Sequence, residues 1–402
     1  MTGKVPMSDT AKILLTLGAL LLLGFATDSL GRRTKLPRVT LLLLFGLLVG
    51  PSGLDLLPDF GRAWFPVVSN MALVMVGFLL GGKLSLDSMR VHGRAILSIS
   101  AAAVLATACL VFLGLLVMGV RADVALLLAG IAPATAPAAT ADVVRESNAD
   151  GPFTRTLLGV VALDDAWGLL VFSVALAGAQ ALSGVDGVSG ALLGGAWEIF
   201  GALLVGILLG VPMAYLTGRI EPGEPTLAEA LGIVFVCGGL ALALNVSFLL
   251  ASMVTGVVVV NLAKHHERPF HAIEGIEWPF LILLFVLAGA SLQMESVRAI
   301  GPVVLAYLVL RAGGRILGGW LGSKGAGLSR VGEKWMGLAL MPQAGVALGM
   351  ALVASNRFPS LGPQIMPVVV CATVIFEIVG PVLTKAALSA AGETNAIGLV
   401  EK

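Results

Sequence analysis

The stretch TLLGVVALDDAWGLLVFSVALAGAQAL, residues 156–182, decides how the rest of the chain is interpreted. As an α-helix it would be ~40 Å long, enough to cross a ~30 Å hydrocarbon layer with some tilt. Its first half holds two adjacent carboxylates, Asp164 and Asp165. One acid at the centre of a transmembrane helix costs roughly 2.5–3.5 kcal/mol on insertion scales, so an adjacent pair needs a compensating partner or ligand. We therefore treat both acids as candidate functional residues.

Composition indicates an α-helical membrane protein. Of the 402 residues, 57% are hydrophobic and 12% are charged, whereas a soluble domain has roughly 25% charged residues. The 51 glycines are typical of helices that pack closely in lipid. A net charge of +1, without a long basic run, argues against a nucleic-acid partner. The three cysteines lie in apolar segments, and we expect them to be packing residues.

Thirteen apolar segments can be drawn along the chain, and the predicted fold class is therefore an all-α polytopic membrane protein with about 13 transmembrane helices. We expect the first segment to be a retained span, because a basic cluster rather than a cleavage site follows it. The predicted segments are 11–28, 36–50, 64–82, 94–120, 122–143, 154–182, 190–217, 226–243, 246–262, 270–292, 299–322, 333–355 and 363–389.

Lysine and arginine are distributed unequally between the loops. Most of those outside the segments follow odd-numbered segments, as Lys83, Arg90 and Arg145 do, and few follow even-numbered ones. Because basic loops remain in the cytoplasm, we expect the N-terminus outside and the C-terminus inside, in a cell (inner) membrane.

Two segments contain helix breakers at mid-depth. The fifth includes IAPATAPAAT, residues 131–140, with Pro133 and Pro137, and the twelfth includes LMPQAGVALG, residues 340–349, with Pro342 and Gln343. Proline removes a helix hydrogen bond, and irregular backbone at that depth is tolerated only where it is buried in protein or lines a cavity. The breaks therefore mark a candidate site.

The two breaks also reveal a repeat. If the seventh segment is a linker, the others form two six-segment units, and each break falls at the fifth position. An odd linker inverts the second unit, which predicts two inverted six-helix repeats with crossed broken helices around a midplane site. The sixth position of each unit carries the acids: Asp164 and Asp165 in one, Glu377 in the other.

Five ionisable residues lie inside predicted segments: Asp164, Asp165, Arg311, Arg315 and Glu377. Some of them could simply neutralise one another as packing pairs, above all Glu377 with one arginine. One counter-ion cannot easily serve both aspartates, because consecutive helical residues point ~100° apart. We therefore predict that one aspartate meets an arginine and the other faces a cavity.

A carboxylate in a wet midplane cavity can bind a monovalent cation through oxygen, helped by hydroxyls and by carbonyls freed at a helix break. It can bind a proton instead, and competition at one site that opens alternately to each side is sufficient for cation/proton exchange. Thr135 and Thr140 could supply oxygen, or could bond back to their own helix.

At these residues the chain resembles the monovalent cation:proton antiporter superfamily, in its sodium/hydrogen exchanger-like, double-aspartate branch, over nearly its whole length. The matching pieces are VGFLLGGKLSLDSMR (76–90), the first break with TADVVRE (132–146), ALDDAWG (162–168), GGRILGGWLG (313–322), GLALMPQAGVALG (337–349) and ATVIFEIVGPVLTKAAL (372–388).

The resemblance implies a domain division and a homodimer without a bound cofactor. Dimerisation helices would come from residues 1–93 and 226–298, with a linker helix in 183–225. Core transport helices would come from 94–182 and from 299–402, which ends in a short cytoplasmic tail. This core would move against the dimerisation domain.

The resemblance also implies roles for the acids. Asp165 matches the essential carrier of the cation and the proton, and Asp164 matches the acid that pairs with a basic residue in the eleventh segment. That residue is Arg315 here, where better-known relatives have lysine, and we predict an Asp164–Arg315 pair, with Arg311 held by Glu377 or water. Because arginine does not release a proton, we expect electroneutral exchange.

A second departure concerns the first break, where many relatives carry an aspartate after the threonine. The corresponding residue here is Ala136, so one possible cation ligand is missing.

The predicted function is secondary active exchange of Na⁺, or alternatively K⁺, for protons in pH homeostasis, and not an enzymatic activity. A potassium efflux system of the same superfamily would normally carry a nucleotide-binding domain, and the chain ends soon after the last segment. An intramembrane aspartyl protease would place its acids in YD and GxGD contexts, which the sequence lacks. A sodium-coupled solute symporter stays open as an alternative.

Overall fold

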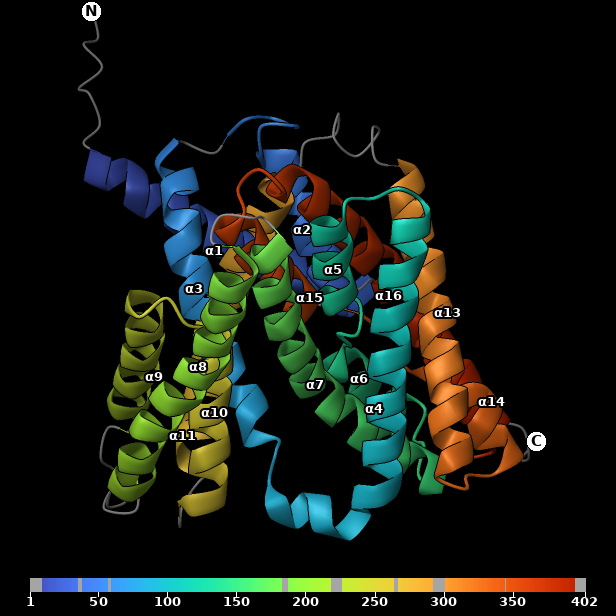
Figure 1. Ribbon diagram of the computed structural model, residues 1–402. Helices are drawn as coiled ribbons and strands as arrows, with labels where there is room; N and C mark the ends of the chain where they lie inside the picture. The colour runs from blue at the N-terminus through green and yellow to red at the C-terminus, as the bar shows by residue number, and fades with distance from the viewer. Residues whose placement is uncertain are drawn as a thin grey trace, which may run out of the picture.

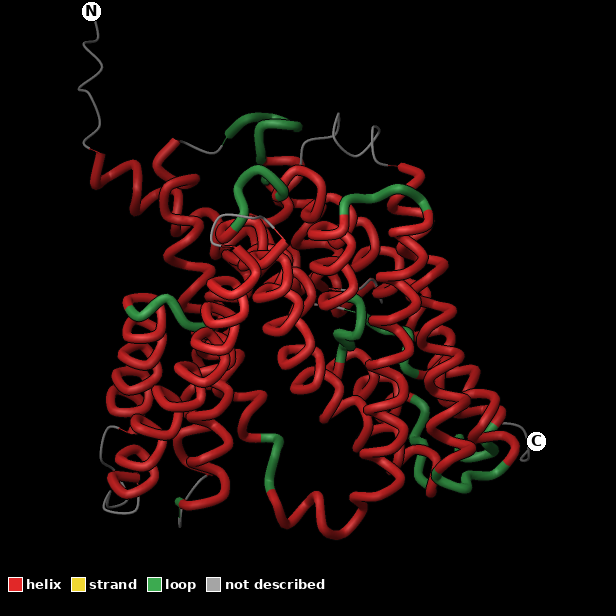
Figure 2. The backbone as a smooth tube through the Cα atoms, viewed as in Figure 1, coloured by secondary structure: helices red, strands yellow, loops and turns green. Residues whose placement is uncertain are grey.

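The structure is a computed structural model that describes residues 9–34, 38–56, 59–182, 187–217, 226–263, 267–291, 301–343 and 345–394. Within these ranges all regular secondary structure is helical, as Figure 2 shows. Parts of the predicted topology, such as the basic loop residues Lys35 and Lys264 and the chain end at Lys402, lie outside the described residues.

Fifteen described helices correspond to the thirteen predicted segments, because the fifth and twelfth segments are each divided into two helices. The helices are α1 (Asp9–Thr34), α2 (Arg38–Val49), α3 (Asp59–Gly82), α4 (Leu86–Val117), α5 (Ala122–Ile131), α6 (Pro137–Glu146), α7 (Pro152–Leu182), α8 (Gly187–Thr217), α9 (Thr226–Ala243), α10 (Phe248–Leu262), α11 (Glu267–Ala290), α13 (Gly301–Gly325), α14 (Arg330–Ala339), α15 (Gly345–Arg357) and α16 (Gly362–Ala390).

Six of the described helices are long and apolar enough to cross a membrane, judged by length and composition alone. The qualifying stretches are Gly93–Val117, Pro152–Leu182, Ala196–Leu216, Glu267–Ala290, Gly301–Gly325 and Gly362–Ala390. Further apolar helices, such as Pro66–Gly82 and Phe248–Leu262, are shorter.

The helices pack as two sets. The scaffold set comprises α1–α3 and α8–α11, and the core set comprises α4–α7 and α13–α16; most helix contacts lie within one set. Figure 1 shows α8–α11 on one side of the molecule and α4, α13 and α14 on the other. The sets meet where α7 packs against α8, α15 against α3 and α11, and α16 against α2. The broken elements α5–α6 and α14–α15 both belong to the core set.

Glycines allow α4 and α13 to run antiparallel in close contact. Gly314, Gly318 and Gly322 recur every four residues on α13, so they share one face. A Cβ added at Gly318 would lie 2.5 Å from the backbone oxygen of Ala102 and 2.5 Å from Cα of Ala103. This glycine face allows the backbones of α4 and α13 to approach closely. Such close packing stabilises helix association in lipid, where the hydrophobic effect contributes little.

Gly318→Ala is accordingly expected to destabilise the protein by about 1–3 kcal/mol, because α4 must move away from its close contact. Thermal unfolding of the purified protein in detergent would measure this loss. Gly232→Ala on α9 is the matched control, since a Cβ there meets nothing within 4 Å. Equal melting temperatures for the two variants would contradict the assigned role of the α4–α13 contact.

Candidate functional site

The two interruptions predicted from proline lie at the centre of the core set. Residues 132–136 separate α5 from α6, with Pro133 in the interruption and Pro137 at the start of α6. Pro137 does not destabilise α6, because the N–H group that proline lacks would have no helical hydrogen-bond acceptor in the first turn. The second interruption follows α14 and contains Pro342 and the fully buried Gln343.

The carbonyls freed by the first interruption are occupied by arginine. Arg311 donates from Nε to the carbonyl of Ala132 (2.9 Å) and from a terminal nitrogen to Ala134 (2.9 Å), and Arg315 donates to the carbonyl of Pro133. Both arginines are fully buried. These three carbonyls therefore each accept a hydrogen bond from a guanidinium group, which leaves at most their second lone pairs for a cation.

Arg311 also connects the two interruptions. Its remaining terminal nitrogen donates to the carbonyl of Met341 at 3.0 Å, and its guanidinium lies 4.2 Å from the centroid of the Phe376 ring. One side chain on α13 thus ties both broken elements together through their backbones. Hydrogen bonds from a charged donor are roughly twice as strong as hydrogen bonds between two neutral groups.

Arg311 was predicted to be held by Glu377 or by water, and the first of these alternatives is wrong. Glu377 on α16 accepts a hydrogen bond of 2.7 Å from the Thr40 hydroxyl near the start of α2. The backbone N–H groups of Val39 and Thr40 also favour the ionised form of its carboxyl group. The reason is that backbone carbonyls already satisfy the guanidinium, while the N-terminus of α2 offers Glu377 unpaired N–H groups. Glu377 therefore joins the core set to the scaffold set.

Asp164 makes the predicted pair with Arg315. A terminal nitrogen of Arg315 lies 2.7 Å from Asp164 Oδ2, and both side chains are fully buried. The other carboxylate oxygen accepts a hydrogen bond from the Ser100 hydroxyl on α4. Removing two charges from water is tolerated only when both are paired and hydrogen-bonded. Here both carboxylate oxygens of Asp164 and both terminal nitrogens of Arg315 are engaged, whereas the Nε of Arg315 has no partner among the described residues.

Asp165 has different surroundings, although it is the next residue. Its Oδ1 accepts hydrogen bonds from the backbone N–H of Thr135 (3.2 Å) and from the Thr135 hydroxyl (3.4 Å). Its Oδ2 is buried and has no hydrogen-bond partner among the described residues. The predicted difference between the two aspartates is thus present: one is held by an arginine, and the other meets the first helix break.

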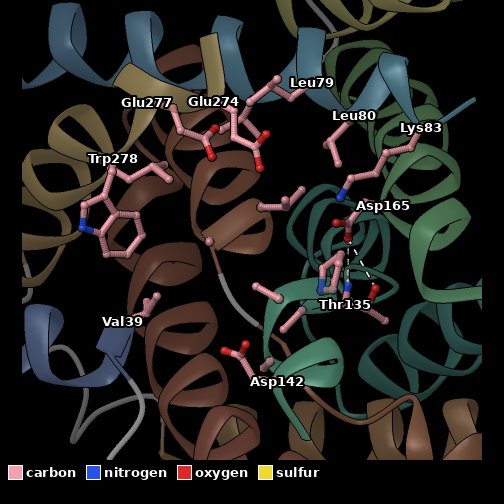
Figure 3. A pocket seen from close by; sticks show the side chains of 18 of the residues that line it. Val39, Leu79, Leu80, Lys83, Thr135, Asp142, Asp165, Glu274, Glu277 and Trp278 are labelled. Carbon is pink, nitrogen blue, oxygen red and sulfur yellow. Dashed lines mark hydrogen bonds between the residues drawn. The ribbon is translucent and has the colours of Figure 1, made fainter. Parts of the chain in front are cut away.

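A cavity of about 1150 Å³ lies between the two sets and reaches Asp165 and Thr135. Scaffold helices α3 and α11 line one wall, and α6, α15 and α16 of the core set line the other. Figure 3 shows Asp165 beside Thr135 at this cavity, with Lys83 directed toward the carboxylate and Glu274 and Glu277 farther away.

Two other predicted residues have buried side chains that make no hydrogen bond among the described residues. They are Thr140, whose hydroxyl has no partner, and Gln343, whose amide nitrogen and oxygen both lack one. Thr140 therefore does not bond back to its own helix, which was one of the two alternatives. Neither residue is in direct hydrogen-bond contact with Asp165.

Three contacts of the site were missed by sequence reasoning: Ser100 on Asp164, Thr40 on Glu377, and Lys83 near Asp165. Ser100 and Thr40 are single polar residues in apolar segments, and such residues give no sign of which acid they meet. Lys83 was counted as a loop charge and lay in the matching stretch 76–90, but it was given no role at the site. Its position directly after the glycine pair Gly81–Gly82, at the end of an apolar segment, was the signal that could have identified it.

Comparison with known proteins agrees with this arrangement. The family model "Sodium/hydrogen exchanger, transmembrane" matches residues 17–390. The ammonium/H⁺ antiporter subunit AmhT of Alkalihalophilus pseudofirmus is 23% identical over 348 residues, covering 85% of this chain and 87% of that protein. Cation/H⁺ antiporter 18 of Arabidopsis thaliana is 25% identical over 328 residues, covering 74% of this chain and 39% of its own length.

A solved structure shows the same fold. The sodium proton antiporter from Methanocaldococcus jannaschii superimposes with a TM-score of 0.77 at 19% identity, covering 94% of this chain and 98% of that one. Since a family model spans most of the sequence and the fold is that of an antiporter, the chain is a multi-pass membrane protein that belongs to the sodium/hydrogen exchanger family of the monovalent cation:proton antiporter superfamily.

Proposed function

We propose that this cation/proton antiporter exchanges a monovalent cation, Na⁺ first and K⁺ as the alternative, for protons at Asp165. The observation that supports this most is the contrast between the adjacent acids: Asp164 is held by Arg315, whereas Asp165 lies at the cavity with one oxygen unpartnered among the described residues. A cation and a proton would compete for that carboxylate, with the Thr135 hydroxyl as a further oxygen ligand.

We assign the transport movement to the core set. Its two broken elements are tied to α13 by Arg311, so they would move as one body against the scaffold set, which would form the homodimer. Lys83 and Arg145 line the cavity, and both follow odd-numbered segments. By the distribution of basic residues, we expect this side of the cavity to face the cytoplasm across a cell (inner) membrane.

Ammonium is a further candidate cation. AmhT, which this chain matches over 87% of its length, is named as a subunit of an ammonium/H⁺ antiporter. A carboxylate with a neighbouring hydroxyl suits an ammonium ion as a hydrogen-bond donor as well as it suits a metal ion.

The deciding experiment is proton flux in proteoliposomes driven by gradients of Na⁺, K⁺ or NH₄⁺. Flux with one or more of these ions, in the direction opposite to the cation, supports exchange. Cation flux that requires a co-transported solute would instead identify a symporter and overturn the proposal.

Exchange is expected to be electroneutral. Asp164 stays ionised against Arg315, which does not release a proton, so only Asp165 alternates between one cation and one proton. A cation-concentration jump on proteoliposomes adsorbed to a supported membrane should give no transport current despite robust proton flux. A current that disappears in Asp165→Asn would refute one-for-one exchange, because each net charge couples transport to the membrane potential by ~2.3 kcal/mol per 100 mV.

A further inference from the structure

Neither buried arginine compensates the charge of Asp165 directly. Arg315 is engaged with Asp164 and Pro133, and Arg311 with three backbone carbonyls. The hydrogen bonds that Asp165 does receive come from the neutral groups of Thr135. A buried carboxylate without a counter-charge is costly, so an emptied site requires a positive charge from elsewhere or a proton.

Lys83 is in a position to supply that charge. It follows the last residue of α3 and lines the same cavity as Asp165. The Lys83 ammonium favours the ionised form of the Asp165 carboxyl group. Figure 3 shows its amine directed toward Asp165.

The backbone around Lys83 is held firmly by a glycine pair. A Cβ at Gly81 would collide with the backbone oxygen of Met253 on α10, and one at Gly82 would lie 2.5 Å from the ring of Phe270 on α11. The N–H of Lys83 then donates to the Leu80 carbonyl at 3.1 Å. The close packing of α3 therefore fixes where the lysine stem begins.

The ammonium group itself is not fixed. The Lys83 side chain is exposed, and no salt bridge is formed by it among the described residues. Its flexible four-carbon stem carries a compact charge that can approach Asp165 or withdraw into the water of the cavity. The stem also starts from the scaffold set, whereas Asp165 belongs to the core set.

We propose that Lys83 is a tethered competitor of the transported cation, an inference that rests on the proposed exchange at Asp165. In the empty site the Lys83 ammonium compensates the Asp165 carboxylate from across the boundary between the two sets. An arriving monovalent cation displaces it. Lys83 thereby weakens the apparent affinity for the cation and, because it is fixed to the scaffold set, does so only in the state in which the cavity is open to it.

The proposal is tested by measuring the cation concentration at which proton flux, or the thermal shift, reaches half of its maximum. Both measurements are made at the same alkaline pH. One measurement is cation-driven proton flux in proteoliposomes, and the other is the thermal shift that Na⁺, K⁺ or NH₄⁺ causes in detergent. Lys83→Met should lower this concentration about three- to tenfold, as expected for one charge acting through a partly aqueous medium. Lys83→Gln serves as a second uncharged variant should Lys83→Met fold poorly.

Two controls make the result specific. Lys83→Arg keeps the charge and should stay within about twofold of the unmodified protein. Lys385→Met removes an exposed lysine that does not line the cavity, and it should also leave the concentration unchanged. An unchanged or higher half-maximal concentration in Lys83→Met, or an equal decrease in Lys385→Met, would overturn the proposal. If the unmodified protein shows no cation-driven flux, the proposed exchange fails, and the thermal shifts still decide the role of Lys83.

Discussion

Asp165→Asn is expected to abolish cation-driven proton flux, with a decrease of at least about a hundredfold that reaches the background of empty liposomes. The amide is neutral, so it neither compensates a bound cation nor exchanges a proton near neutral pH. Stability should be retained or increased, because the substitution removes a buried charge whose Oδ2 has no partner among the described residues. Flux in proteoliposomes and thermal unfolding in detergent measure the two effects separately.

The same variant should lose the thermal shift that a saturating cation produces in the unmodified protein, since a ligand stabilises only the state that binds it. Asp150→Asn is the matched control, because Asp150 lies in an exposed loop and pairs with exposed Arg155 at 3.1 Å. Surface pairs of this kind contribute little, so this control should transport normally. Normal flux in Asp165→Asn would show that the exchanged ions use a different group.

Arg315→Ala is expected to cause the largest loss of stability, about 3–5 kcal/mol, because it leaves the Asp164 charge buried without its partner. Adding Asp164→Asn should restore part of this loss. The restoration should stay incomplete, since the carbonyl of Pro133 also loses the hydrogen bond that Arg315 donates. A double-mutant cycle of unfolding free energies in detergent measures the coupling between the two residues.

The outcome that would contradict this pairing is simple additivity of the two single effects in the double variant. Arg315→Lys is an informative companion. It retains the positive charge near Asp164 but has a single ammonium in place of the forked guanidinium. It should therefore lose less stability than Arg315→Ala.

Much of the fold was predictable from the sequence because lipid imposes strong constraints. A helix that crosses a membrane needs a long apolar segment, and the apolar segments of this chain could be read directly from the sequence. Prolines inside two of these segments predicted the helix interruptions at 131–140 and 340–349, and an interruption at that depth must be buried in protein or line a cavity. The Asp164–Arg315 pair was also predictable. Its members are among the few charges in apolar segments, and the family resemblance implied a basic partner for Asp164 in the eleventh segment.

The partners of Glu377 and Asp165 were not predictable in the same way. A carboxylate can be satisfied by arginine, by a hydroxyl or by the N–H groups of a helix start, and sequence does not state which is nearest. Arg311 was expected to meet Glu377 or water, because opposite charges attract. Instead, the three carbonyls of Ala132, Ala134 and Met341 satisfy Arg311, and Thr40 satisfies Glu377.

The occupied carbonyls have a consequence for ion selectivity. Filters that distinguish ions sharply do so by replacing most of the hydration shell with backbone oxygens held at a defined spacing. In this protein the carbonyls of Ala132, Pro133 and Ala134 already accept from guanidinium groups. An ion at Asp165 would therefore keep much of its own water, and we expect discrimination among monovalent cations of different radius to be shallow.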